Sequence, residues 1–309
     1  MTTLPYTIVD VFAPQRYQGN PLAVFDARDP AAQALLTTEL MQTIARELGF
    51  QEITFVMGGS PGAGFAVRIF TPEYEVPFAG HPTLGTAWVL ANRLVGTGRA
   101  PLTLQLGVGP VPVQWIGDTP WLTAAQPTFG SSYDRAELAE LLQLPPDALD
   151  DRLPIERVST GLLYVIIPIR TLAAMRAIRI DVSALEAWLL RHGLHKTNSP
   201  EGLHTSLYPV CSETYDPAHG LNARMFCFEQ GHVAEDYATG SAGSCLLAYL
   251  LKNRVLGDGT VRLRVEQGYE AGRPSLLELD GSLTANGEYR LQIGGTVQYV
   301  AAGEWALDA

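Results

Sequence analysis

Three side chains that can carry protons, Glu52, His81 and Asp236, stand next to turns or predicted helix starts in this 309-residue chain. Carboxylates and imidazoles are the usual groups that add or remove protons during a reaction. His81 lies in the segment AGHPT, and the proline after it suits the first turn of a helix. An imidazole at a helix start can meet a bound anion, or it can serve a local hydrogen bond alone. His81 is therefore a candidate for either role.

The two carboxylates also have a chemical and a structural interpretation. Asp236 lies in AEDYATGSAGS, where an aspartate or a serine can cap a helix. Glu52 lies in QEITFV at 51–56, at the start of an apolar, strand-like run. Inside a cleft its pKa would rise towards the range that suits proton transfer, whereas at a strand edge it would be solvated. Ser241 could donate a hydrogen bond to a substrate or cap the helix, and these alternatives stay open.

An internal repeat places these residues in similar surroundings. RIFT, from Arg68, leads through a loop to AGHPTLGTAWVLANRLVGTG at 79–98. RMFC, from Arg224, leads through a loop to ATGSAGSCLLAYLLKNRVLGDG at 238–259. Both blocks run from a strand through a loop to a helix that begins with small residues and continues with apolar ones. The repeat predicts a duplicated α/β unit.

The duplication also predicts where a ligand binds. Two equivalent helix N-termini would face each other across a cleft between the halves, with Asp236 opposite His81. Each N-terminus offers backbone N–H groups and the positive end of a helix dipole, which suit a carboxylate. Gly80 and Gly240 would let the backbone approach that ligand closely. We therefore expect a small carboxylate-bearing molecule as the partner of this site.

The elements that must position the site alternate between strands and helices. A polar stretch with a proline at 126–134 suggests a boundary, so we assign 1–128 and 129–309 to two half-domains, with the last strand near 296–309 free to return to the first. Apolar spacing and turn residues predict five helices, at 33–48, 83–94, 134–143, 182–191 and 241–253. Strands between them give an α+β or α/β protein.

Composition narrows the partners and the chemistry. The net charge of −11 argues against nucleic acid and anionic membranes, which both need a basic surface. The longest apolar stretch, 162–169, is too short to span a bilayer, and the N-terminus lacks the features of a signal peptide. Three cysteines suggest reduced thiols and a cytoplasmic protein. Because no cysteine precedes Cys211, epimerisation by a thiol at each helix start is excluded.

No cofactor or metal is expected. The chain has no phosphate-binding GxxxxGK[ST] motif. His192 and His195 follow a predicted helix and have neither a cysteine nor a carboxylate pair beside them, so we interpret them as surface residues and not as metal ligands.

Four segments, taken in order, resemble the PhzF-like phenazine-biosynthesis family: NPLAVF at 20–25, QEITFV at 51–56, PFAGHPTLGTA at 77–87 and EDYATGSA at 235–242. The resemblance implies an α+β, diaminopimelate-epimerase-like fold of two pseudo-symmetric halves, each with a sheet wrapped around a central helix. It implies a cofactor-free isomerase, resembling trans-2,3-dihydro-3-hydroxyanthranilate isomerase, and a homodimer.

The same resemblance assigns roles to residues. It makes Glu52 the carrier of the proton, His81 and Asp236 its acid/base and orienting partners, and Gly80 and Ser241 further substrate contacts. Gln51, Ile53 and Tyr237 depart from the usual pattern of the family and flank the predicted site, which leaves the substrate open. The alternative is a non-catalytic member that uses the cleft to bind a small molecule or its surface to bind a protein.

Overall fold

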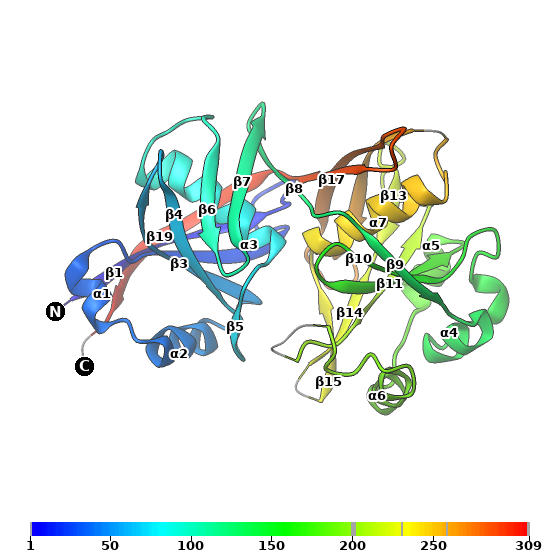
Figure 1. Ribbon diagram of the computed structural model, residues 1–309. Helices are drawn as coiled ribbons and strands as arrows, with labels where there is room; N and C mark the ends of the chain where they lie inside the picture. The colour runs from blue at the N-terminus through cyan, green and yellow to red at the C-terminus, as the bar shows by residue number, and fades with distance from the viewer. Residues whose placement is uncertain (1, 199–201, 230, 258, 308–309) are drawn as a thin grey trace. The chain divides into compact units, whose positions relative to one another are not determined.

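The computed structural model describes residues 2–198, 202–229, 231–257 and 259–307, which form two compact units (Figure 1). Unit 1 comprises Met1–Thr123 and Gly294–Ala309, and unit 2 comprises Ala124–Ile293. The sequence placed the boundary after residue 128, and the units divide after Thr123. The last strand belongs to unit 1, where it pairs antiparallel with the first strand and brings Thr3 opposite Ala306.

Unit 1 begins with three strands, of which the second and third are parallel because two helices connect them. An antiparallel partner follows, and then a short hairpin strand, a buried helix and three more strands. Its elements are β1 (Thr3–Val11), β2 (Asn20–Asp26), α1 (Pro30–Leu35), α2 (Thr38–Leu48), β3 (Glu52–Ser60), β4 (Gly64–Phe70), β5 (Glu75–Val76), α3 (Gly80–Val89), η1 (Leu90–Leu94), β6 (Leu102–Leu106), β7 (Gly109–Ile116), β8 (Thr119–Thr123) and β19 (Val297–Ala306).

Unit 2 repeats this order. Its elements are β9 (Thr128–Ser132), α4 (Arg135–Leu141), η2 (Pro146–Ala148), β10 (Glu156–Ser159), β11 (Leu163–Ile169), α5 (Leu172–Ala177), α6 (Val182–Arg191), β12 (Ser206–Cys211), β13 (Leu221–Ala223), β14 (Met225–Glu229), β15 (His232–Asp236), α7 (Gly240–Lys252), β16 (Thr260–Gln267), β17 (Ser275–Leu283) and β18 (Tyr289–Gly294). The parallel pair β2–β3 corresponds to β11–β12, and the hairpin β4–β5 corresponds to β14–β15. The strands after each buried helix also correspond, because β6 is parallel to β4 and β16 is parallel to β13.

An ion pair marks the same place in both repeats. Arg68 on β4 contacts Glu75 on β5 through two hydrogen bonds, of 2.7 and 2.5 Å. Arg224, next to β14, contacts Glu235 on β15 through two of 2.8 and 2.6 Å. Each glutamate lies five residues before the glycine that begins the buried helix. These matching contacts support the internal duplication that the sequence predicted.

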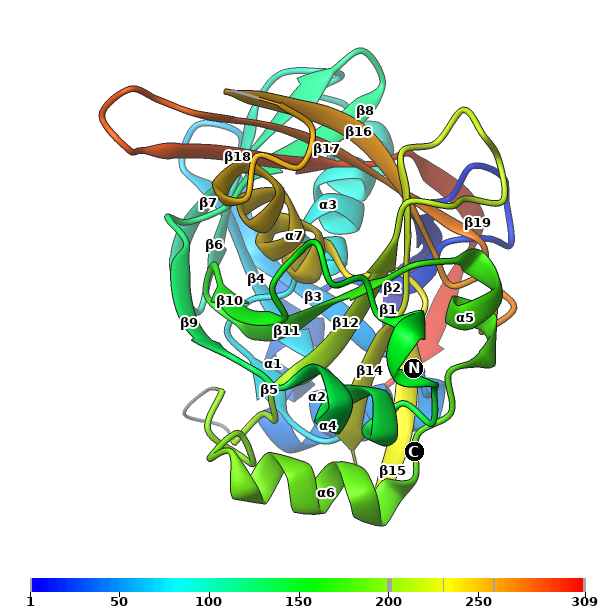
Figure 2. The ribbon, with the colours of Figure 1, turned by 90° about the vertical axis from the view of Figure 1, so that its right-hand side faces the viewer.

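A buried helix occupies the middle of each unit. All of α3 except Trp88 is buried, and it packs against β1, β2 and β8. In α7 almost every residue is buried, and the helix packs against β10, β11, β16 and β17 (Figure 2). Gly85 permits the close contact of α3 with its strands, because a Cβ there would lie 2.6 Å from Leu22 and 2.7 Å from Val11. Each unit therefore wraps its strands around one apolar helix.

The helix predicted at 33–48 is wrong as a single element. The structure has two helices here, because Thr37 ends the first segment in an extended conformation and caps the second, where its hydroxyl accepts a hydrogen bond from the Leu40 N–H. The helix predicted to begin near residue 83 begins at Gly80. The prediction at 182–191 is confirmed, with Asp181 as its cap.

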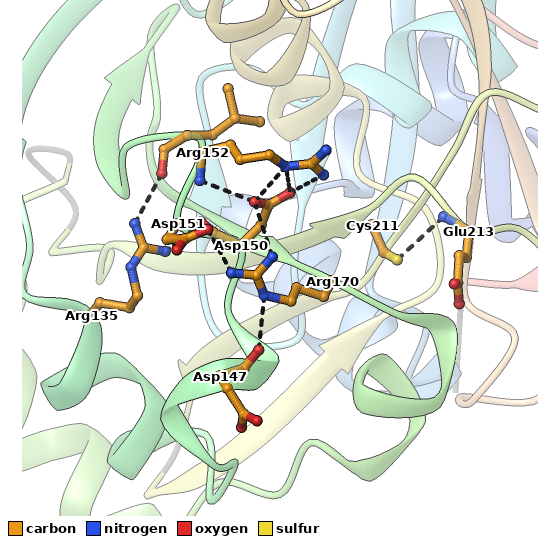
Figure 3. A network of polar contacts seen from close by, with 9 residues as sticks. Arg135, Asp147, Asp150, Asp151, Arg152, Arg170, Cys211 and Glu213 are labelled. Atoms are coloured by element: carbon orange, nitrogen blue, oxygen red, sulfur yellow. Dashed lines mark hydrogen bonds and ion pairs between the residues drawn. The ribbon is translucent and has the colours of Figure 1, made fainter.

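A cluster of arginines and aspartates holds one end of unit 2 together (Figure 3). Asp150, 8% exposed, accepts hydrogen bonds of 2.9 and 2.5 Å from the Arg152 guanidinium, and these bonds lower the pKa of the Asp150 carboxyl to about 2. Arg170 contacts Asp151 at 2.5 Å and the Asp147 carbonyl at 2.9 Å. These contacts tie the turn after η2 to the end of β11.

Candidate active site

Glu52 and His81 lie side by side in unit 1. Glu52 is the first residue of β3 and stands opposite Leu22 of the parallel strand β2. His81 is the second residue of α3. The distance from Glu52 Oε2 to His81 Nε2 is 3.7 Å, and the two side chains are 19% and 4% exposed. The structure thus brings together two of the three proton-carrying residues that the sequence predicted.

His81 is a neutral imidazole. Burial of the ring lowers its pKa to about 3, so the ring is uncharged around neutral pH. A neutral imidazole has one N–H donor and one nitrogen that accepts. Within the part of the chain that the structure describes, His81 Nε2 is buried and makes no hydrogen bond. Since buried polar atoms rarely stay unbonded without a reason, this nitrogen is suited to a bound substrate.

The start of α3 adds backbone donors to this pair. Ala79 is the N-cap residue, has an extended backbone and makes no side-chain capping bond, and Gly80 is the first helical residue. The Thr83 hydroxyl turns back to donate to the Ala79 carbonyl at 2.7 Å. The N–H groups of the first helical turn point out of the helix and carry partial positive charge. They lie in the same stretch of chain as His81, where they could bind a carboxylate.

Asp236 is the last residue of β15 in unit 2 and is 6% exposed. Its Oδ2 accepts a hydrogen bond from the Thr239 hydroxyl. The N-cap residue of α7 is Thr239, so the interpretation of Asp236 as the helix cap is wrong. Gly240 is the first residue of the helix. The acid is therefore held beside the N-terminus of α7 by a side-chain contact.

Ser241 has a partner that the sequence analysis did not identify. Its Oγ lies 2.6 Å from the hydroxyl of Tyr164 on β11, and burial raises the pKa of that phenol well above its ordinary value. Tyr164 was missed because it stands inside the apolar run LLYVIIPI, which reads as core. The repeat gives the signal that could have found it: Tyr164 pairs with Ser206 in the way that Leu22 pairs with Glu52.

The predicted site residues therefore divide between the units. Glu52, Gly80 and His81 belong to unit 1, while Asp236, Gly240 and Ser241 belong to unit 2. A common cleft for the two sets stays a prediction.

His192 and His195, which the sequence did not predict to be metal ligands, have local partners. His192 Nε2 contacts Glu137 at 3.0 Å, and the rings of His195 and His204 lie 4.3 Å apart. Among the described residues, no group of three or more His, Cys, Asp and Glu side chains is arranged to hold a metal ion. In the same part of the chain, no helix combines the length and apolarity that a membrane span requires.

Comparison with known proteins gives the family. Residues 9–303 match the family described as phenazine biosynthesis-like protein. An uncharacterized isomerase of Mesorhizobium japonicum is 33% identical, over 98% of this chain and 99% of its own length. The trans-2,3-dihydro-3-hydroxyanthranilate isomerase of Pseudomonas aeruginosa is also 33% identical, over 87% of each chain.

Solved structures agree. The PhzF-family phenazine biosynthesis protein of Bacillus anthracis superposes with a TM-score of 0.86 and 28% identity, over 99% of this chain and all of the other. A hydroxyproline epimerase of Agrobacterium vitis shares the fold, with a TM-score of 0.62 at 14% identity over 99% and 93% of the two chains. The diaminopimelate-epimerase-like fold is thereby confirmed. This chain belongs to the phenazine biosynthesis-like protein family, and it is an isomerase.

Proposed function

We propose that this chain is a cofactor-independent isomerase that moves a proton between two carbon atoms of a small, cyclic, carboxylate-bearing and amino-acid-like substrate. The observation that carries the proposal is the pair formed by Glu52 and His81, with Oε2 and Nε2 3.7 Å apart at the start of a buried helix. A carboxylate beside a neutral imidazole is a suitable pair for general acid–base chemistry. The relatives named as isomerases support the reaction class.

In this reaction Glu52 would take a proton from one ring carbon and return it to another, so that the substrate's composition is unchanged. The electron pair left by the first step would shift across the conjugated system until the second carbon is protonated. His81, being neutral, would hydrogen-bond to the oxygen or nitrogen on which negative charge develops. The backbone N–H groups at the start of α3 would hold the substrate carboxylate.

Asp236 and Ser241 would contact the substrate from unit 2. The carboxylate of Asp236 suits an amino or hydroxyl group of the substrate, because an ionised carboxylate only accepts hydrogen bonds. Ser241, bonded to Tyr164, is a hydroxyl of fixed position. Both roles belong to the proposal, as does the phenazine precursor itself, which is the substrate named for the Pseudomonas aeruginosa relative.

The test follows protons and binding together. The protein is incubated in deuterium oxide with trans-2,3-dihydro-3-hydroxyanthranilate and with a panel of cyclic amino acids, and NMR records both deuterium at ring carbons and the change of isomer. Turnover with label entering the product supports the proposal. A ligand that raises the melting temperature without any exchange indicates the non-catalytic alternative, because binding to the folded state alone stabilises it.

A further inference from the structure

A fully buried glutamine joins the parts of unit 2 that surround Asp236. The side chain of Gln267, the last residue of β16, has no exposed surface. Its Nε2 donates hydrogen bonds of 3.0 Å to the Asp236 carbonyl and to the Thr239 hydroxyl. Its Oε1 accepts bonds from the Thr239 N–H at 3.2 Å and from the Tyr208 hydroxyl at 3.1 Å. All four bonding positions of the amide are therefore occupied.

These bonds determine the direction of the Thr239 hydroxyl. The Thr239 N–H can only donate, so it requires the oxygen of the Gln267 amide on its side and leaves the amide nitrogen to face the hydroxyl. A hydroxyl has a single proton, and because the Thr239 oxygen receives a hydrogen bond from Gln267, its own proton is directed to Asp236 Oδ2. Gln267 thus makes Thr239 a fixed donor to the Asp236 carboxylate.

The other unit shows that the fold does not require this set. Asp236 ends β15, Thr239 is the N-cap of α7, and Gln267 ends β16. The residues in the corresponding places of unit 1 are all apolar: Val76 ends β5, Ala79 is the N-cap of α3, and Leu106 ends β6.

The next residues confirm this correspondence. Gly107 follows Leu106, and a Cβ on it would lie 2.8 Å from the Pro77 backbone. Gly268 follows Gln267, and a Cβ on it would lie 2.4 Å from the Tyr237 backbone. Pro77 follows Val76 as Tyr237 follows Asp236. The same turn therefore forms with three apolar residues in unit 1 and with three polar residues in unit 2. Because the turn does not need polar residues, we look for another role for Asp236, Thr239 and Gln267.

We propose that Thr239 and Gln267 are positioning residues for Asp236, with Thr239 as its direct hydrogen-bond donor and Gln267 as the group that aims Thr239. The inference rests on the proposed function, in which Asp236 contacts the substrate. A donor to a carboxylate favours the ionised form and fixes its rotamer. Removal of the donor should therefore change both the rate and the pH at which Asp236 becomes protonated.

The matched pair Thr239→Val and Thr239→Ser tests the donor. Valine keeps the branched shape but has no hydroxyl, whereas serine keeps the hydroxyl. A hydrogen bond to a charged group has about the energy of a tenfold change in rate or more, so we expect Thr239→Val to lower kcat about tenfold. The acid limb of its pH–rate profile should move to higher pH, while Thr239→Ser stays within about twofold of the wild type.

Gln267→Leu tests whether Gln267 directs the Thr239 hydroxyl. The substitution gives unit 2 the same residue type that unit 1 has at the corresponding position, Leu106. It should reproduce the loss of kcat and the shifted acid limb while Thr239 is intact. If Thr239→Val does not fold, Thr239→Ala replaces it, since Ala79 shows that the turn accepts alanine. Thr239→Val with wild-type kcat and an unchanged acid limb would overturn the proposal. So would Thr239→Ser with the same defect as Thr239→Val.

A measurement without substrate separates this inference from the proposed function. The protein is labelled with ¹³C at aspartate carboxyl groups, and the Asp236 signal, assigned by its loss in Asp236→Asn, is followed against pH. Thr239→Val and Gln267→Leu should shift its midpoint upward even if no substrate is turned over. An unchanged midpoint contradicts the positioning role, whereas a shifted midpoint in a protein that never isomerises a substrate contradicts only the proposed function.

Discussion

Glu52 and Ser206 are counterparts in the two repeats. Each faces a residue of a parallel neighbouring strand, Leu22 for Glu52 and Tyr164 for Ser206. Both repeats also have a matching arginine, Arg68 on β4 or Arg224 next to β14. Glu52 and Ser206 each lie three residues before the residue that pairs with this arginine. A carboxylate is therefore present at this position in unit 1 and a hydroxyl in unit 2. The asymmetry predicts that one group, Glu52, carries the proton both away from and back to the substrate.

Replacement of Glu52 by glutamine should separate binding from proton transfer. The amide keeps the size of the side chain but cannot act as a base, so the rate should fall by roughly two to four orders of magnitude while the substrate still binds. Label incorporation in deuterium oxide measures the rate, and calorimetry measures the affinity. Glu47→Gln, on the exposed face of α2, is the control and should behave as the wild type. Wild-type exchange in Glu52→Gln would transfer the proton-carrying role to Asp236 or His81.

Asp150 should contribute to stability and not to activity. Its hydrogen bonds to Arg152 lower the pKa of the folded-state carboxyl to about 2, below its ordinary value. The resulting stabilisation is present at neutral pH and disappears as the pH falls towards 2. Asp150→Asn should lower the free energy of unfolding at neutral pH by about 1 kcal/mol. Asp151→Asn, at a side chain that is 67% exposed, should change it little.

Urea titrations at neutral and acidic pH measure both variants. The difference between Asp150→Asn and the wild type should shrink at low pH, where the wild-type carboxyl is also protonated. A difference that is the same at every pH would mean that packing around Asp150, and not its charge, produces the effect.

The repeat made the duplicated α/β unit predictable from sequence, because two helix starts built from small residues can be recognised by pattern alone. Glu52 and His81 were assigned to one site by the family resemblance, because each residue alone also had a purely structural interpretation, and the structure places Glu52 Oε2 3.7 Å from His81 Nε2. Gln267 and Tyr208 were not predicted, since each acts through contacts with residues distant in sequence, which no local pattern reveals. The break between α1 and α2 was missed because the capping residue, Thr37, lies between apolar residues that keep their four-residue spacing.

Activity should survive alkylation of thiols. Cys211 and Cys245 are buried, and burial raises their pKa values to about 11 and about 12, so both stay protonated and react slowly. Iodoacetamide should therefore leave the turnover rate unchanged, and a variant with all three cysteines replaced by serine should keep it if folded. Loss of turnover in that variant, with the melting temperature retained, would show that a thiol takes part in the reaction.

Prolonged dialysis against EDTA should also leave the turnover rate unchanged, because the proposed proton transfer uses side chains and backbone N–H groups alone. Restoration of lost activity by added Zn²⁺ or Mg²⁺, but not by buffer, would contradict this expectation.

His81 should make the protein less stable in mild acid. Burial lowers the pKa of the folded-state ring to about 3, whereas an unfolded histidine titrates near its ordinary value. The unfolded chain therefore binds a proton that the folded protein excludes, so stability is full above the unfolded pKa and falls as the pH decreases towards 3. Between about pH 7 and about pH 5 this difference costs about 2 kcal/mol of unfolding free energy.

His81→Gln has no ring to protonate, so its free energy of unfolding should fall less over the same interval, as measured by urea unfolding at both pH values. His204, whose pKa burial lowers to about 4, is retained in both proteins and cancels in the comparison. Equal losses in wild type and His81→Gln would mean that the buried ring accepts a proton in the folded state, and the neutral hydrogen-bonding role of His81 would then have to be abandoned.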